Sequence, residues 1–293
     1  MHLNSPKIAI LLAAYNGMDY IKIQVDSILK QKNVIVDLFI SVDYSSDETY
    51  NWALELSLKN EKNVHILPYG EVFGIASRNF YRLIKDVDFS NFNYIALADQ
   101  DDIWMTNKII SAIDALEVNK AVGYSCNTIA FWDDGRRENI NRPTIQKKFD
   151  YYFEPSGPGC TFVIKKEMAM ILKDFVINNW TKVNDVHSHD WLIYAFIRSN
   201  GQKWYIDKRE FMLYRQHQKN QFGVRNGLKA YLYRMRNVKN GWYRDEIKKI
   251  YGLVFIEGCF NLNRWFLIRN FYQLRRGNMD VFFLLLMLLI GVF

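Results

Sequence analysis

The sequence has few cysteines, and none of the three is placed for a disulfide framework or a thiol metal site. Cys126, Cys160 and Cys259 are widely separated, odd in number and include no CxxC pair. This spacing is typical of small buried side chains in a reducing compartment. The amino-terminal segment lacks the pattern of a signal peptide, because the apolar run at 8–14 is short and ends in a turn signal. We therefore expect a cytoplasmic protein.

Motifs of several large enzyme classes are also absent. There is no GxxxxGK[ST] phosphate loop and no GxGxxG after the first predicted strand, which argues against NTPases and dinucleotide-dependent dehydrogenases. His187 and His189 do not form the helix-borne HExxH of zinc enzymes, so zinc is not expected. We find no internal repeat. The apolar run at 281–293 is shorter than the ~20 residues that a membrane-spanning helix needs.

The composition is that of a globular protein with an unevenly distributed charge. The chain has 293 residues, 49% of them hydrophobic, which is ample for a buried core. The formal net charge of +7 resides in the carboxyl-terminal part, where residues 216–293 carry 13 Lys and Arg against 4 Asp and Glu. We predict a body over 1–222 and a basic, aromatic, helical region over 223–293.

Strand and helix patterns alternate through the first 120 residues. This alternation predicts an α/β fold with a doubly wound, mostly parallel sheet flanked by helices, in which the loops after the first, second and fourth strands share one edge. A strand at 121–126, a polar loop at 133–148, a strand at 160–164, a helix at 190–197 and two short strands at 203–206 and 211–214 are expected next. The expected early strands are 8–12, 36–42, 64–67 and 94–98, and the expected early helices are 19–31, 47–60, 76–85 and 105–117.

Three carboxylates, Asp99, Asp101 and Asp102, follow directly after the predicted strand at 94–98. In an extended segment, residues two apart point the same way, so Asp99 and Asp101 can meet on one side. The residues leave two interpretations open. The cluster is a turn with a helix N-cap, since aspartate caps helices well. Alternatively it is a site for a divalent cation and a phosphate, since hard cations prefer oxygen ligands and ligands bind at this edge of such sheets.

Four further side chains each have a chemical and a structural interpretation. Tyr15 offers a ring face for a nucleobase or is a core aromatic. Asp43 accepts a hydrogen bond from a base or a ribose, or belongs to turn chemistry. Asp190 heads an apolar helix, where the dipole favours its ionised form, so it is a general base or a helix cap. His217 is a ligand or an ordinary satisfied histidine.

The region over 223–293 also has two interpretations. Its last helix packs on the body, or the region lies on the inner membrane surface, where Lys and Arg meet anionic headgroups and aromatics settle at the interface. The basic, aromatic composition favours the membrane. Nucleic acid is not expected, because no binding motif accompanies the positive charge.

Six segments in this order resemble one enzyme family, the inverting family-2 glycosyltransferases with the GT-A type fold. The resemblance covers about residues 6–225. The DQDDIW, HDW and YRQHxxN forms look most like bacterial rhamnosyltransferases, which build cell-surface polysaccharides from dTDP-rhamnose. The segments are AYNG at 14–17, DYSSD at 43–47, ADQDDIW at 98–104, GPGCT at 157–161, HDW at 189–191 and LYRQH at 213–217 with Asn220.

The resemblance implies roles for these positions. It implies a Mg²⁺ or Mn²⁺ cofactor, a nucleotide-sugar donor, a saccharide or lipid-linked acceptor, and a single displacement that inverts the anomeric centre. The basic tail and the closing apolar run, rather than the resemblance, lead us to expect a cytoplasmic enzyme that is peripheral on the inner face of the cell membrane. The implied residues are Asp190 as the catalytic base; Ala14, Tyr15, Asn16, Asp43, Asp99 and Gln100 for the donor; Asp101 and His217 for the metal; and Gly159 and Trp191 on the acceptor side.

Two positions depart from the family pattern. Val42 and Tyr44 replace the first Asp and the Gly of the usual DDGS segment, which reshapes the expected nucleoside pocket. A family-2 transferase that uses a UDP-hexose is therefore the chief rival. A non-catalytic carbohydrate-binding relative is the alternative from another class. A nucleotide-sugar pyrophosphorylase lacks support, because its Gly-rich loop is missing after the first strand.

Overall fold

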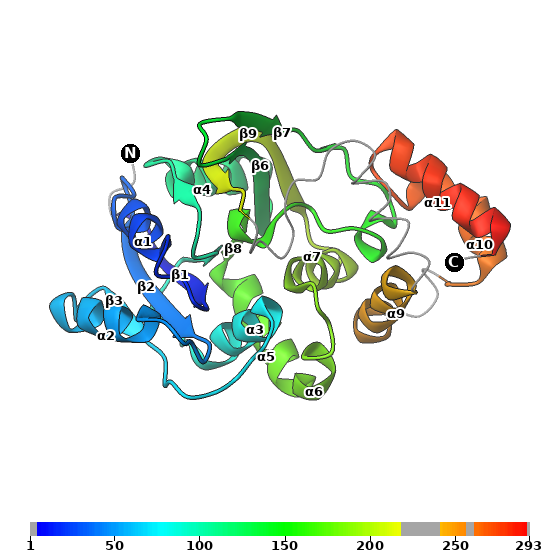
Figure 1. The fold of residues 1–293 in the computed structure, drawn as a ribbon. Helices are drawn as coiled ribbons and strands as arrows, with labels where there is room; N and C mark the ends of the chain where they lie inside the picture. The colour runs from blue at the N-terminus through cyan, green and yellow to red at the C-terminus, as the bar shows by residue number, and fades with distance from the viewer. Residues whose placement is uncertain (1–4, 218–240, 256–260, 292–293) are drawn as a thin grey trace.

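The computed structural model describes residues 5–217, 241–255 and 261–291 (Figure 1). Its centre is a mixed sheet in the order β3-β2-β1-β4-β8-β6-β9-β5, and β7 pairs with the later part of β6, at residues 128–131. The strands are β1 (Lys7–Ala14), β2 (Ile35–Val42), β3 (Val64–Ile66), β4 (Tyr94–Ala98), β5 (Ile103–Trp104), β6 (Gly123–Phe131), β7 (Arg137–Ile140), β8 (Val163–Lys165) and β9 (Trp204–Arg215).

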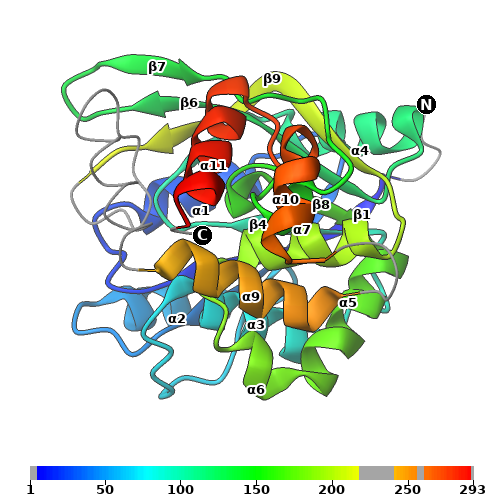
Figure 2. The same ribbon diagram turned by 90° about the vertical axis from the view of Figure 1, so that its right-hand side faces the viewer.

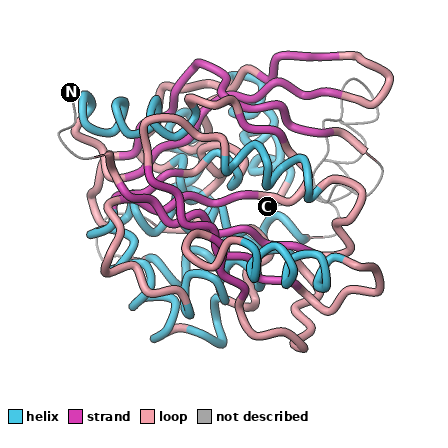
Figure 3. Tube along the Cα trace, turned by 90° about the vertical axis from the view of Figure 1, so that its left-hand side faces the viewer, coloured by secondary structure: helices cyan, strands magenta, loops and turns pink. Residues whose placement is uncertain are grey.

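Helices cover both faces of this sheet, as Figure 3 shows from the side of the amino-terminal strands. The helices of the body are α1 (Ile21–Leu29), α2 (Thr49–Lys59), α3 (Ala76–Asp86), α4 (Lys108–Asn119), α5 (Lys166–Asn178), α6 (Trp180–Val183) and α7 (His189–Ser199), with 3₁₀ turns η1 (Asp150–Tyr152) and η2 (Gly159–Thr161). The carboxyl-terminal elements are α9 (Trp242–Val254), α10 (Arg264–Arg269), the 3₁₀ turn η3 (Phe271–Gln273) and α11 (Asn278–Ile290).

The first half of the sheet is parallel, as predicted. β1 pairs in parallel with β2 and β4, and the register sets Ala14 opposite Val42 and Leu12 opposite Ala98. After Lys7, β1 is apolar and buried on both faces, with Ile8, Ile10 and Leu12 in one hydrophobic cluster and the alternate residues in the other. The loops after β1, β2 and β4 therefore share one edge, as predicted.

The second half departs from the expected strands in three places. β8 enters antiparallel between β4 and β6, so the sheet is mixed. β7 lies inside the segment 133–148, which was predicted to be a loop. The two short strands predicted at 203–206 and 211–214 are one strand, β9, which passes through register shifts against β6. The polar residues 208–210 resemble a turn in sequence, but they form a bulge, which bends a strand without ending it.

The carboxyl-terminal helices extend the core of the body. Ile247 of α9, Leu267 of α10 and Leu284 and Leu288 of α11 belong to the same hydrophobic cluster as α3, α5 and α7. α9, α10 and α11 lie together on one side of the molecule (Figure 2). The predicted boundary at 222 lies outside the described residues. No helix in the described ranges has the length and apolar character needed to cross a bilayer.

Candidate active site

The loops after β1 and β2 are tied to each other by hydrogen bonds. Asn16, whose φ is 44°, donates its backbone N–H to Ser45 Oγ at 3.0 Å, and its Oδ1 accepts the Ser46 N–H at 2.8 Å. Gly17 N–H donates to Thr49 Oγ1 at 2.7 Å. Asparagine tolerates the left-handed conformation better than most residues, which explains its place at this turn. The two loops therefore form one rigid wall of the site.

Gln100 fastens this wall to the acidic cluster. Its Oε1 accepts the Tyr15 N–H at 2.8 Å, and its Nε2 donates to the Tyr15 carbonyl at 2.9 Å. A Cβ on Gly17 would lie 2.2 Å from Gln100 Oε1, so only glycine fits beside the amide. Tyr15 itself is 54% exposed, so its ring is not a core aromatic. Gln100 thus fixes the loop that presents Tyr15.

Asp43 lies at the end of β2 and is largely buried. Its Oδ1 accepts the N–H groups of Tyr44 and Phe73, both at 2.8 Å, and its Oδ2 accepts that of Gly74 at 2.9 Å. An ionised carboxylate accepts about four hydrogen bonds. Asp43 therefore organises the turn after β2 through three hydrogen bonds, and about one acceptor position remains on its carboxylate.

The carboxylates after β4 crowd one another. Burial first, and then the charge of Asp101, raise the pKa of Asp99 to about 7. Burial and the charges of Asp101 and Asp99 raise the pKa of Asp102 well above its usual range. Asp102 accepts the Arg215 N–H at 3.3 Å through Oδ1, while its buried Oδ2 has no hydrogen-bond partner. Burial is the larger cause of both shifts, and the neighbouring negative charges add to it.

Asp101 faces His217. Asp101 Oδ2 lies 2.8 Å from His217 Nε2, and the His217 ring packs against Tyr20 with 4.8 Å between ring centroids. Arg215 donates its Nε–H to the Asp101 carbonyl and ion-pairs with Asp133 at 3.0 Å. His217, which follows β9, therefore lies beside Asp101 although the two residues are 116 positions apart in the sequence.

The donor set suits a hard divalent cation. Within the described residues, one group of three potential ligand atoms lies within 4.8 Å, and it comprises Asp99, Asp102 and Cys160. Burial, and next the charge of Asp102, raise the pKa of the Cys160 thiol, so it stays protonated and is no thiolate ligand. Carboxylate oxygens, an unpartnered oxygen on Asp102 and a nearby imidazole fit Mg²⁺ or Mn²⁺ better than a soft metal.

The turn at η2 joins the acidic cluster to α7. Cys160 lies beside Asp99 and Asp102, and the preceding residue, Gly159, packs against His189. A Cβ on Gly159 would lie 2.4 Å from His189 Nε2, so the turn requires glycine here. Burial lowers the pKa of His189 to about 3, so the ring is neutral, and it stacks on Phe80 with centroids 4.1 Å apart. Gly159 is therefore a packing residue between the two halves of the site.

Asp190 occupies the first turn of α7, half-buried, with its Oδ1 accepting the Trp191 N–H at 2.8 Å. Burial raises the pKa of Asp190 to about 6, and the Trp191 N–H and the charge of Arg142 limit the rise. The charge of Asp190 in turn contributes to the raised pKa of Asp99. The two carboxylates therefore lie close enough for their charges to interact. A carboxylate with a pKa near 6 is ionised at neutral pH and more basic than an ordinary aspartate.

Trp191 differs from its expected place. It is 3% exposed, donates its Nε1–H to the Tyr151 carbonyl at 2.9 Å and stacks on Tyr243 of α9 with centroids 5.7 Å apart. Its indole is a core side chain between α7 and α9. It therefore does not present its ring on the acceptor side, and it acts there only by holding α7 in place.

Glu246 of α9 was missed by the sequence reasoning. It is completely buried, and its Oε1 accepts the backbone N–H groups of His187 and Ser188 at 2.6 and 3.0 Å. These two residues lead directly into Asp190. Nothing in the sequence signals this contact, because its partners lie 58 and 59 residues away. Arg142, whose charge acts on Asp190, was likewise hidden in a segment predicted as a loop.

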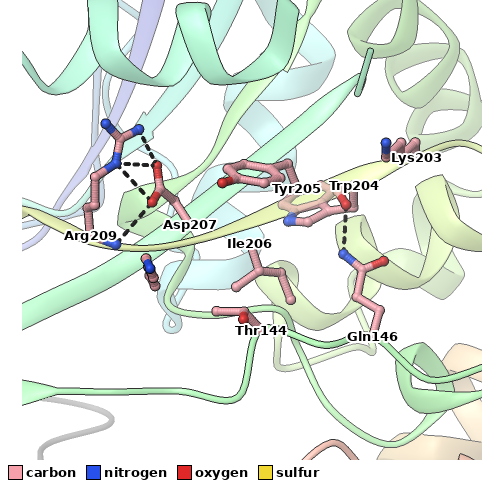
Figure 4. A pocket seen from close by; sticks show the side chains of 9 residues that line it. Thr144, Gln146, Lys203, Trp204, Tyr205, Ile206, Asp207 and Arg209 are labelled. Carbon is pink, nitrogen blue, oxygen red and sulfur yellow. Dashed lines mark hydrogen bonds and ion pairs between the residues drawn. The ribbon is translucent and has the colours of Figure 1, made fainter. Parts of the chain in front are cut away.

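A hollow of about 400 Å³ lies elsewhere, along the start of β9 (Figure 4). Gln146 bridges it by donating to the Trp204 carbonyl, and Asp207 pairs with Arg209 at 2.7 Å. None of the predicted site residues lines it. The candidate site is therefore not this hollow. It lies at the edge of the sheet where the loops after β1, β2 and β4 meet.

Comparisons with known proteins agree with this geometry. The family model described as "Glycosyl transferase family 2" matches residues 9–180. The dTDP-rhamnosyl transferase RfbG of Shigella flexneri is 43% identical over 289 residues, which is 96% of this chain and 100% of RfbG. The UDP-Glc:alpha-D-GlcNAc-diphosphoundecaprenol beta-1,3-glucosyltransferase WfaP of Escherichia coli is 31% identical over 39% of this chain and 42% of its own.

Solved structures share the fold. The S. aureus TarS 1–349 complex with UDP superposes with a TM-score of 0.59 at 14% identity, covering 91% of this chain and 72% of the other. The complex with UDP-GlcNAc gives a TM-score of 0.54 at 13% identity, covering 94% and 75%. At this identity the likeness concerns the arrangement of the strands and helices alone.

Proposed function

Because the chain belongs to glycosyltransferase family 2 and has its GT-A type fold, it is a glycosyltransferase, and we propose that it transfers rhamnose from dTDP-rhamnose. The acceptor is a hydroxyl of a growing cell-surface polysaccharide, and the anomeric configuration inverts. The observation that carries this proposal is the 43% identity to the dTDP-rhamnosyl transferase RfbG over 96% of this chain, and it is supported by the acidic cluster after β4, where Asp101 lies 2.8 Å from His217.

The donor lies on the wall formed by the loops after β1 and β2. Residues 14–16 and the Tyr15 ring line the nucleoside, Asp43 accepts one hydrogen bond from it with its remaining oxygen position, and Asp99 contacts the ribose. Gln100 holds the Tyr15 backbone through two hydrogen bonds, so the wall is in place before the donor arrives. Because these loops are already held in place, less conformational entropy is lost when the donor binds.

The diphosphate lies at the acidic cluster. Family 2 enzymes generally use a divalent metal ion, and Asp101 and His217, with Asp99 beside them, would hold Mg²⁺ or Mn²⁺ here. When bound, the ion supplies positive charge to the leaving diphosphate and orients it. The raised pKa of Asp99 and the unpartnered Oδ2 of Asp102 are the observations that favour a cation at this point.

Asp190 carries out the proton transfer. Its carboxylate accepts the proton of the acceptor hydroxyl while that oxygen bonds to the anomeric carbon. The bond from the anomeric carbon to the diphosphate oxygen breaks in the same displacement, and the nucleoside diphosphate leaves with that electron pair. A general base of this kind contributes about 10²–10⁴-fold to the rate.

The relatives also bear on the sugar and the acceptor. RfbG, which this chain covers from end to end, is named for dTDP-rhamnose, whereas WfaP and WfgD, named for UDP-Glc, match over about half of their length or less. The rhamnose donor is therefore favoured over a UDP-hexose. The names of WfaP and WfgD include a diphosphoundecaprenol acceptor. We infer a lipid-linked acceptor here too, reached by a peripheral enzyme at the cytoplasmic face of the membrane.

A panel of nucleotide sugars tests the donor. The protein is incubated with Mn²⁺ or Mg²⁺, a lipid-diphosphate-linked saccharide and each donor in turn, and release of nucleoside diphosphate is measured. Release of dTDP from dTDP-rhamnose, absent in Asp190→Asn, supports the proposal. Preferential release of UDP from a UDP-hexose overturns the rhamnose assignment, and sugar binding without release from any donor would identify a non-catalytic relative.

A further inference from the structure

α11 is apolar on the side that faces away from the protein. Val281, Leu284 and Leu288 are buried against the body. These three side chains form the face by which α11 packs on the protein. A surface helix of a globular protein normally has a polar outer face. On α11 the outer side chains are apolar as well, and each is at least 45% exposed; they are Met279, Phe282, Leu286, Leu289 and Ile290.

The spacing of these side chains makes a continuous stripe. Positions 279, 282, 286 and 289 are three or four residues apart and so lie on one helix face. The neighbouring helix α10 lies beside α11 (Figure 2), and its Trp265 is 77% exposed. Exposed patches of this kind mark contact surfaces, whereas apolar residues scattered singly do not.

A basic pocket lies next to the stripe. A cavity of about 220 Å³ between α9 and α10 is lined by the cations Arg244, Lys248 and Arg264, with Ile247, Leu262 and Leu267 as its apolar part. None of the described residues that line it is a carboxylate, and Asp245 approaches Arg244 only to 3.8 Å at the exposed surface. The three cations would attract a negatively charged phosphate, and the apolar side chains would contact a hydrocarbon chain attached to it. The lining therefore suits the phosphate of a lipid.

Arg264 connects the pocket with α11. Its Nε–H and Nη2–H donate to the carbonyls of Leu288 and Leu289, both at 2.6 Å. The last carbonyls of a helix otherwise need water, so this cap lets the end of α11 enter an environment without water. The other acids nearby are engaged elsewhere, since Glu246 is buried on the body and Asp280 lies 3.7 Å from Arg275.

We propose that the outer face of α11, with Trp265 and the pocket of Arg244, Lys248 and Arg264, docks on an anionic phospholipid bilayer. α11 lies in the interface plane with its stripe among the acyl chains, and the pocket takes a lipid phosphate. An interfacial helix binds by apolar burial together with attraction to anionic lipids. This surface deepens the proposed function, because it brings the enzyme to a lipid-linked acceptor.

Vesicle sedimentation of the full chain tests the surface, without donor or acceptor. We expect binding to phosphatidylcholine vesicles that contain phosphatidylglycerol, and much weaker binding to phosphatidylcholine alone. Phe282→Ser and Leu286→Ser should each weaken binding about tenfold or more. Arg244→Gln and Lys248→Gln should each weaken it about fivefold, and only on anionic vesicles. Leu58→Ser and Lys59→Gln on the exposed side of α2 are matched controls that should change nothing.

The outcomes distinguish a lipid bilayer from a second copy of the chain as the partner of this surface. Equal binding to neutral and anionic vesicles, or binding unaffected by Phe282→Ser and Leu286→Ser, overturns the proposal. If the chain is a dimer by light scattering that these two variants split into monomers, with no vesicle binding by either form, α11 is an interface between copies instead. Failure of vesicle binding leaves dTDP release on a soluble acceptor intact, so the two proposals are judged independently.

Discussion

Glu246 is expected to position the catalytic base from a helix outside the matched family region. Its buried Oε1 accepts the N–H groups of His187 and Ser188, the two residues that lead into α7. Glu246→Ala leaves both donors without an acceptor. Each unsatisfied buried group costs about 1–3 kcal/mol, so the expected loss of unfolding free energy is about 2–6 kcal/mol. Glu246→Gln keeps an acceptor oxygen, so its loss should be smaller.

A second readout distinguishes positioning from stability alone. Burial is the main cause of the raised pKa of Asp190, and the negative charge of Glu246 adds to it. Removing that charge in Glu246→Gln should therefore move the acid limb of the kcat/KM profile to lower pH. Asp245→Asn, at the neighbouring exposed position, is the control and should move neither quantity.

The assays are urea unfolding followed by fluorescence, and nucleoside diphosphate release between pH 4.5 and 8. We expect Glu246→Ala to lose stability and, per folded molecule, turnover, since α7 and Asp190 shift together. The reasoning is refuted if Glu246→Ala unfolds at the same urea concentration as the parent. It is refuted equally if the acid limb of Glu246→Gln coincides with that of the parent.

Three further predictions concern the site itself. Because the pKa of Asp190 is raised to about 6 and the base must be ionised, kcat/KM should fall about tenfold per pH unit below pH 6; a profile flat to pH 5 contradicts this. Gly159→Ala should lower turnover, since its Cβ would lie 2.4 Å from His189 Nε2, whereas Gly157→Ala, with its nearest atom at 3.7 Å, should not. Asp101→Ala should weaken metal-dependent donor binding by more than about tenfold in calorimetry, and unchanged metal dependence would refute its role as a ligand.

The first half of the fold could be predicted from the sequence because its signals are local. Apolar runs such as 8–12 and 94–98 are bounded by polar loops, and their alternation with helices fixes a parallel sheet. β9 was misread because its bulge at 208–210 looks like a turn, and a bulge depends on pairing with β6. The antiparallel entry of β8 likewise depends on the tertiary partners β4 and β6.

The candidate site was predictable in its carboxylates and less so in its supports. The order of the motifs along the chain identified Asp99, Asp101 and Asp190 as candidates. In the structure, the charges of Asp101 and Asp190 both raise the pKa of Asp99. The roles of Gln100 and Glu246 were not predictable, because they hold backbone groups of distant loops and such bonds have no sequence pattern. Trp191 shows the converse, since a motif position suggested a contact that burial excludes.

The most direct test of the central claim is the effect of Asp190→Asn on turnover and donor affinity measured together. The side chains have the same shape, so binding of dTDP-rhamnose should remain within about twofold, while kcat falls about 10²–10⁴-fold because no base accepts the hydroxyl proton. A variant with unchanged kcat, or one that loses donor affinity in proportion to its activity, would contradict the role of Asp190 as the base.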